Sequence, residues 1–196
     1  MPPFQIPAED EIRALVARIV DVMHQDPMAE APMPPVADQF EGAVEAIAIG
    51  ADHGGFRLKE RIVFRLREKG HEVVDCGTDS NDSVDYPDLA LAVAEKVSSG
   101  ECRWGVVIDG AGIGSSMAAN KVPGVRAALC YDVSSARNSR EHNHANVLTL
   151  GAGLIGDNLA GEIVEAWLDT PWGEGRHARR VSKIDDIETK YTRSHA

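Results

Sequence analysis

The chain has 196 residues, of which 43% are hydrophobic and 26% are charged, so it holds enough apolar material for one sizeable core. Its 31 acidic and 20 basic residues give a net charge of −11, which argues against a nucleic-acid binder because a phosphate backbone needs a basic face. No run approaches the roughly 18 apolar residues of a membrane helix, and nothing resembles a signal peptide. The three cysteines form no CxxC pair, which fits a reduced cytoplasmic protein.

Residues 1–42 differ in composition from the rest, because they hold seven of the ten prolines. Inside this stretch, an apolar stripe at helical spacing predicts an amphipathic helix over 9–24. The stripe consists of Ile12, Leu15, Val16, Ile19, Val20 and Met23. A lone helix of this length is marginal in water, so the stripe needs a surface on which to pack. Residues 25–42 read as a Pro-rich linker. We therefore expect an N-terminal extension, 1–42, and one domain, 43–196.

From residue 44 onward, strand patterns alternate with helix patterns. Predicted strands cover 44–50, 72–76, 105–109, 125–131 and 146–150, and predicted helices cover 56–69, 89–98, 115–120, 134–141, 156–169 and 177–190. This alternation predicts an α/β fold, a three-layer α/β/α sandwich around a five-stranded parallel Rossmann-like sheet. Ligands of such sheets bind beyond the carboxyl ends of the strands, so the candidate site residues are sought there.

A glycine-rich turn follows the third predicted strand. It runs through Asp109, Gly110, Ala111, Gly112, Ile113, Gly114 and Ser115. Its backbone N–H groups can converge at a helix N-terminus and form an anion hole; the alternative is a tight turn with no ligand. The spacing is GxGxG, which is weak support for a dinucleotide. Asp109 at the mouth of the turn is a candidate general base, or else a cap of the next helix.

Histidines and arginines supply the other candidate groups. His53, beside Asp52, and His142 can exchange protons near neutral pH. Arg176 and Arg180 are four residues apart and share one helical face, so they can grip a phosphate. The alternative is a solvated basic patch opposite the acidic residues at 185–186. No histidine or cysteine spacing matches a metal site, so we expect neither a metal nor a cofactor.

Five segments together resemble the ribose-5-phosphate isomerase B / galactose-6-phosphate isomerase family. They are GADHGGFRLKE, VVDCGTDSNDSVDYPDLA, VVIDGAGIGSSMAANKVPGVRAALC, SARNSREHNHANVLTLG and EGRHARRV, in order from about residue 46 to the end. The resemblance implies a metal-independent interconversion of aldose and ketose phosphates. It also implies a homodimer or dimer of dimers, with sites shared across the interface.

The resemblance assigns a role to each matching position. Asp109 would move the proton of a cis-enediolate mechanism, and His142 would open the sugar ring, reaching in from the partner chain. The positions implied to bind the substrate are Asp52, His53, Tyr86, Gly110, Ala111, Gly112, Ile113, Gly114, Ser115, Asn143, Arg176 and Arg180. Among these, the arginines would hold the phosphate and the turn would hold the enediolate.

Four positions depart from the family pattern. The ribose enzymes commonly have Cys at Asp109 and often Thr or Ser at Ala111; other members carry a Glu base at Ser115 or an Arg at Gly153. Asp at the cysteine position resembles one of the two galactose-6-phosphate isomerase subunits. The leading hypothesis is therefore an isomerase of a phosphorylated sugar. The alternatives are a paralogous subunit, or a sugar-phosphate-binding module, in which catalysis is altered or lost.

The extension resembles a peptide that targets enzymes into bacterial microcompartments. This resemblance implies a microcompartment shell as a partner of residues 9–24, and the microcompartment interior as the location within the cytoplasm. The alternatives are a helix that packs on its own dimer and a disordered tail.

Overall fold

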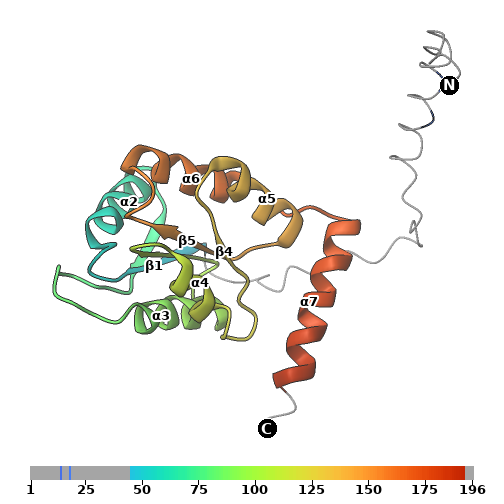
Figure 1. Cartoon of the computed structure of the whole chain (residues 1–196), viewed down its shortest axis with the longest axis horizontal. Coiled ribbons are helices and arrows are strands. Elements are labelled where there is room, and N and C mark those ends of the chain that lie inside the picture. Colours follow the sequence, from blue (N-terminus) through green and yellow to red (C-terminus); the bar gives the residue numbers. More distant parts are fainter. Residues whose placement is uncertain (1–13, 15–17, 19–44, 193–196) are drawn as a thin grey trace, which may run out of the picture. The chain divides into compact units, whose positions relative to one another are not determined.

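A computed structural model describes residues 14, 18 and 45–192 (Figure 1). The chain divides into two units, residues 1–33 and 34–196, and the fold below belongs to the second. The predicted helix over 9–24, the linker and the boundary at 42–43 lie outside the described residues. The exceptions are Ala14 and Arg18, which are helical and exposed.

Five strands form one parallel sheet in the order β2-β1-β3-β5-β4. The strands are β1 (Ala46–Ala51), β2 (Glu72–Asp75), β3 (Trp104–Asp109), β4 (Ala127–Leu129) and β5 (Val147–Gly151). A helix separates each strand from the next, as parallel connections require. The predicted five-stranded parallel sheet is therefore confirmed.

Helices cover both faces of the sheet (Figure 1). The helices that cover it are α2 (Phe56–Glu68), α3 (Tyr86–Ser98), α4 (Ile113–Ala119), α5 (Val133–Asn143) and α6 (Asp157–Asp169), whereas α7 (Arg176–Thr192) packs against α5. Helices α2, α5 and α6 lie on one face of the sheet, whereas α3 and α4 pack together on the other. This arrangement confirms the predicted sandwich. None of the described helices is both long enough and apolar enough to cross a membrane.

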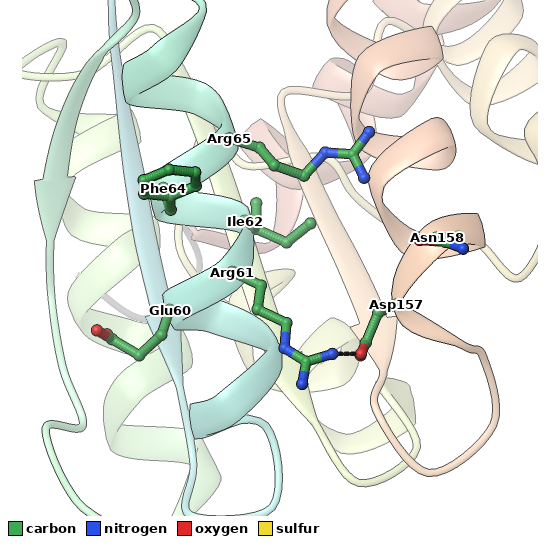
Figure 2. A pocket seen from close by; sticks show the side chains of 7 residues that line it. All are labelled: Glu60, Arg61, Ile62, Phe64, Arg65, Asp157 and Asn158. Atoms are coloured by element: carbon green, nitrogen blue, oxygen red, sulfur yellow. Dashed lines mark ion pairs between the residues drawn. The ribbon is translucent and has the colours of Figure 1, made fainter.

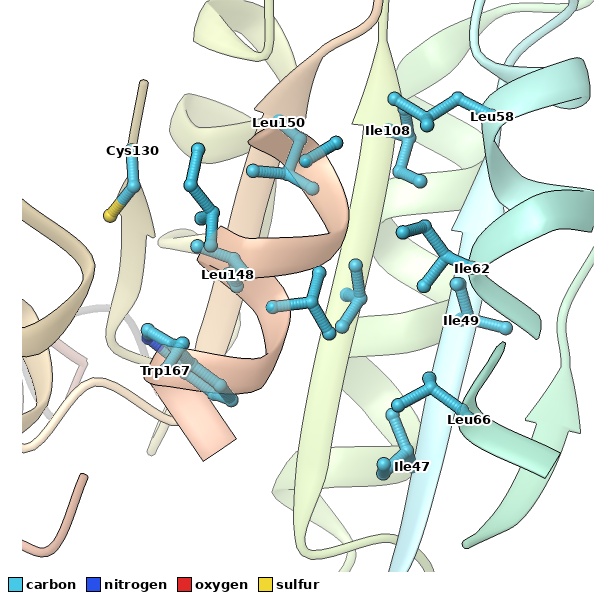
Figure 3. Packing of buried hydrophobic residues seen from close by; sticks show 14 of the residues in the cluster. Ile47, Ile49, Leu58, Ile62, Leu66, Ile108, Cys130, Leu148, Leu150 and Trp167 are labelled. Carbon is cyan, nitrogen blue, oxygen red and sulfur yellow. The ribbon is translucent and has the colours of Figure 1, made fainter. Parts of the chain in front are cut away.

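Alternation along the strands divides the core between the two faces. In β1, Ile47 and Ile49 face α2 and α6, whereas Ala46 and Ala48 face α3. The first cluster is the larger, and it includes the fully buried Trp167 of α6 (Figure 3). The small residues on the other side allow α3 to lie close to the sheet. Every residue of β1 and β3 is buried, as expected for central strands of a parallel sheet.

The bounds of every element differ from the prediction by one to three residues at one or both ends, and for two elements the reason is identifiable. Helix α3 begins at Tyr86, three residues before the predicted start, because Pro87 suits the first turn of a helix. Strand β4 covers only three residues, Ala127–Leu129, and pairs with β5 alone among the strands. On its free side, the Asn120 side-chain amide makes two 2.9 Å bonds, with the N–H and the C=O of Ala127. This amide takes the place of a neighbouring strand.

Candidate active site

The carboxylate of Asp109 lies at the end of β3 and is 5% exposed. One oxygen, Oδ1, accepts hydrogen bonds from the N–H of Ala111 at 2.7 Å and from the N–H of Gly112. The other, Oδ2, accepts from the Ser115 N–H at 3.1 Å and from the Ser115 hydroxyl. A carboxylate offers about four acceptor positions, so all are occupied. The resting geometry is thus that of the capping alternative.

Glycines allow the turn to close around this carboxylate. Gly112 has φ +78°, and a Cβ there would lie 2.5 Å from Leu129 Cδ1 and 2.8 Å from the carbonyl carbon of Leu150. At Gly114, a Cβ would lie 2.5 Å from the ring of Tyr86. The turn is therefore packed between the carboxyl ends of β4 and β5 on one side and the start of α3 on the other.

Asp52 and His53 lie beside the same turn, after β1. Asp52 is 9% exposed, and its Oδ1 accepts a hydrogen bond of 2.9 Å from the N–H of Gly55. The His53 ring is exposed, and its Nδ1 accepts from the Val84 N–H at 3.4 Å. A Cβ on Gly54 would lie 3.3 Å from Asp52 Oδ1 and 3.7 Å from the Gly110 nitrogen. The loops after β1 and β3 therefore adjoin.

Tyr131 belongs to this group, and sequence reasoning missed it. Its hydroxyl donates a 2.8 Å hydrogen bond to the carbonyl of Ala111. The loop after β5 is bonded to the turn as well, since the N–H groups of 152 and 153 donate to the carbonyls of 109 and 110 at 2.8 and 2.9 Å. The available signal was position, because Tyr131 is the last residue of the fourth predicted strand.

The remaining candidates gather at the opposite end of the strands, where the strands of the sheet begin. The imidazole of His142, near the end of α5, stacks on that of His177 with ring centroids 4.1 Å apart and an interplanar angle of 7°. Its Nδ1 lies 2.8 Å from Nδ2 of Asn138. Asn143 ends α5, and Arg176 and Arg180 are exposed near the start of α7. These residues form a second cluster of polar groups.

The chain trace separates the two clusters. Helix α5 starts beyond the carboxyl end of β4 and runs back to the amino end of β5, so His142 lies at the amino edge. Strand β5 rises about 3.3 Å per residue over Val147–Gly151, which puts roughly 13 Å between the two edges. One subunit therefore does not bring His142, Arg176 or Arg180 next to Asp109.

The pKa of His177 in the second cluster is lowered. Burial is the main cause, and the charges of Arg176 and Arg180 act in the same direction, whereas Glu141 opposes them. His144 follows the same rule: burial lowers its pKa, and a hydrogen bond to the Gly173 carbonyl only partly opposes this. An anion would be the complementary ligand for such a cluster.

Another part of the described chain carries charged side chains away from the two clusters. A hollow of about 440 Å³ lies between α2 and α6, where an ion pair joins Arg61 to Asp157 and the side chain of Phe64 is exposed (Figure 2). Its lining includes none of the candidate residues. Within residues 45–192, no group of three or more histidine, cysteine or acidic side chains is arranged to hold a metal ion.

The sheet and the polar groups at its edges define a doubly wound α/β protein with a candidate site beyond its strands. The chain belongs to the Ribose/Galactose Isomerase family, which it matches over residues 47–184. It is 47% identical over 147 residues to ribose-5-phosphate isomerase B of Escherichia coli, covering 75% of this chain and 99% of that protein.

Solved structures show the same likeness. Ribose-5-phosphate isomerase B of Clostridium thermocellum is 56% identical, with a TM-score of 0.74, over 74% of this chain and 99% of that one. The enzyme of Mycoplasma genitalium, solved with bound ribulose-5-phosphate, is 40% identical, with a TM-score of 0.71, over 74% of this chain and 96% of that one. The similarity thus covers nearly the full length of these relatives.

Proposed function

We propose that the protein is an aldose–ketose isomerase of a phosphorylated sugar, of the ribose 5-phosphate/ribulose 5-phosphate type. The observation that carries this proposal is membership of the Ribose/Galactose Isomerase family, with relatives named ribose-5-phosphate isomerase B. The polar groups that follow β1 and β3 support it, because they adjoin at the edge where such sheets bind ligands.

The proposed reaction has two stages. In the first, His142 takes the proton of the O1 hydroxyl while the bond between C1 and the ring oxygen breaks, and the ring oxygen gains a proton. In the second, Asp109 removes the proton on C2, the electron pair of that C–H bond forms the C1–C2 double bond, and the electron pair of the C1 carbonyl moves onto O1. Asp109 then returns the proton to C1 while the proton of the O2 hydroxyl passes to O1, so that O2 becomes the ketone. The intermediate is a cis-enediolate, for which backbone N–H groups are suitable donors.

The turn must rearrange slightly for Asp109 to act as the base. The Ser115 hydroxyl is the donor that can leave, because rotation about its C–O bond turns the proton away from Asp109 and frees one acceptor position. The N–H groups of Ile113 and Gly114, in the first turn of α4, have no partner within the helix and can face the enediolate.

We propose that two copies share each site. The separation of His142 from Asp109 across the sheet supports a site in which one subunit supplies the carboxyl edge and its partner supplies the second cluster. Two exposed apolar patches support such a contact: Ile184, Ile187 and Tyr191 on α7, and Tyr86, Ile113 and Met117 around the turn. Arg180 precedes Ile184 by one helical turn, so it lies on the same face as the first patch.

A specific observation favours a second candidate function. The four bonds accepted by Asp109 describe a carboxylate that holds the turn closed, and such a carboxylate is a poor base. A sugar-phosphate-binding protein, or a paralogous subunit whose own catalysis is lost, would fit this geometry equally well.

Sugar phosphates incubated with the enzyme in D₂O distinguish these functions. A panel of five- and six-carbon aldose phosphates is followed by proton NMR, and binding of each compound is measured by calorimetry. Conversion with deuterium incorporation at the carbon that gains the proton is expected for an enediolate isomerase. Tight binding without conversion or exchange would establish the second candidate, and the absence of both would overturn the two together.

The extension supports a proposal about location. We propose that residues 9–24 dock on the shell of a bacterial microcompartment, so that the enzyme works within that compartment of the cytoplasm. The six apolar residues at helical spacing and the long Pro-rich linker support this proposal.

A further inference from the structure

The segment between α6 and α7 is attached to the end of α5 by a ring stack. The indole of Trp172 lies parallel to the His144 imidazole, with centroids 4.9 Å apart and an interplanar angle of 1°. Trp104 meets the same indole edge-on, with centroids 6.0 Å apart, and the guanidinium of Arg126 lies 5.8 Å from its ring centre. Such planar contacts fix the orientation of a ring as well as its position.

Hydrogen bonds reinforce the stack. Nε2 of His144 lies 2.7 Å from the carbonyl oxygen of Gly173, and the Gly173 N–H donates to the carbonyl of Glu141 at 2.8 Å. The side chain of His144 is 3% exposed, and its φ of 51° ends α5. A Cβ on Gly173 would lie 2.5 Å from the Glu141 oxygen, so only glycine allows this approach. We name Trp172, Gly173 and His144 the Trp172 clamp.

The Trp172 clamp lies directly before the arginines of α7. Arg176 begins that helix three residues after Gly173, and Arg180 follows one turn later. Farther along, α7 is bonded through Asp185 to Arg126 at 3.2 Å and through Glu188 to the Gly124 N–H at 2.9 Å. These bonds restrain the middle and end of α7, whereas the clamp restrains its start.

We propose that Trp172 and His144 are positioning residues, which hold Arg176 and Arg180 at the geometry that binds the substrate phosphate. The inference rests on the proposed function and concerns two residues to which the family resemblance assigned no role. A guanidinium binds phosphate strongly only when its donors are held in place, and small displacements of a positioned group cost affinity and rate.

The test compares three variants of the full-length chain. Trp172→Leu removes the planar ring, Trp172→Phe keeps one, and Phe64→Leu is the matched control, an exposed aromatic side chain on α2 outside the clamp. Inorganic phosphate is titrated by calorimetry, and kcat and KM are measured with ribose 5-phosphate. Thermal melting is recorded for each variant.

We expect Trp172→Leu to weaken phosphate binding and raise KM by roughly tenfold while kcat changes by less than about threefold. Trp172→Phe and Phe64→Leu should stay within about twofold of the wild type. A lower melting temperature with unchanged phosphate affinity would assign the clamp a purely structural role and overturn the proposal. If the wild type neither binds phosphate nor turns over substrate, the proposed function fails instead.

A second variant covers the case in which Trp172→Leu does not fold. His144→Asn removes the stack and the bond to Gly173, while asparagine tolerates the left-handed backbone at this position. The same loss of phosphate affinity is expected. Wild-type affinity in a folded His144→Asn protein would contradict the proposal.

Discussion

Asp109 is held by four hydrogen bonds, so its replacement tests the turn and the reaction together. Asparagine keeps one oxygen for Ala111 and Gly112 but turns an NH₂ group toward the N–H and hydroxyl of Ser115. We expect Asp109→Asn to lower the free energy of unfolding by about 1–3 kcal/mol, from unsatisfied buried donors. Turnover should fall by about two orders of magnitude or more if the base is lost.

Ser115→Ala is the control for that prediction, because it removes only the hydroxyl bond to Oδ2. If Asp109 is the base, this variant keeps turnover within about tenfold of the wild type, while Asp109→Asn does not. Chemical denaturation and steady-state kinetics measure both effects. Wild-type turnover in Asp109→Asn would show that the carboxylate caps the turn and is not the catalytic base.

The buried His144 links stability to pH. Its pKa is lowered in the folded protein, chiefly by burial, so below about pH 6.5 the unfolded chain binds the proton more readily than the folded one. The free energy of unfolding should therefore fall as the pH drops from 6.5 toward the folded pKa, and remain level above 6.5 as far as this group is concerned. His144→Asn should reduce that slope in denaturation series between pH 8 and pH 5; an unchanged slope would assign it to His177, whose pKa is also lowered.

At the scale of elements, the junction of β3 with α4 depends more on Gly112 than on Gly110. Gly112→Ala adds a methyl group at φ +78°, against Leu129 and the Leu150 backbone, and we expect it to cost roughly 2–4 kcal/mol. Gly110→Ala is the matched control, since nothing lies within 4 Å of the added carbon. Thermal melting should separate the two variants clearly; equal melting temperatures would show that the turn can relax.

The elements were largely predictable because local patterns encode them. Short apolar runs between helical patterns located all five strands. The rule that ligands bind beyond the carboxyl ends of parallel strands selected the turn after β3. The four hydrogen bonds accepted by the Asp109 carboxylate were not predictable. They form because the turn, through Gly112, folds back onto this carboxylate. The stack of Trp172 on His144 joins a linker to a distant helix end, and no periodicity describes such a contact.

At the scale of the whole molecule, a shared site predicts complementation between two inactive variants. Asp109→Asn and His142→Gln disable different edges of the sheet. When the two are unfolded, mixed and refolded, half of the symmetric dimers are hybrids, and each hybrid has one intact site, so about a quarter of the wild-type activity should return. Each variant refolded separately gives the baseline. Recovery no greater than the sum of the two baselines would contradict a site built from two copies.

The extension supplies a prediction about assembly. Deletion of residues 1–42 should leave melting and isomerase activity close to those of the full chain, because the family match begins at residue 47. The same deletion should abolish co-sedimentation with microcompartment shells, and Asp at both Leu15 and Ile19 should mimic it by putting charge into the apolar stripe. A clear loss of thermal stability or of dimer after truncation would indicate instead that the helix packs on the enzyme.

The bond between Gly153 and the turn leaves little room for a side chain at position 153. The N–H of Gly153 donates to the carbonyl of Gly110, and a Cβ at 153 would lie 2.9 Å from that same oxygen. A side chain at position 153 therefore requires the backbone at 110 or 153 to shift. The effects of mutations at these two positions should for this reason be coupled rather than additive.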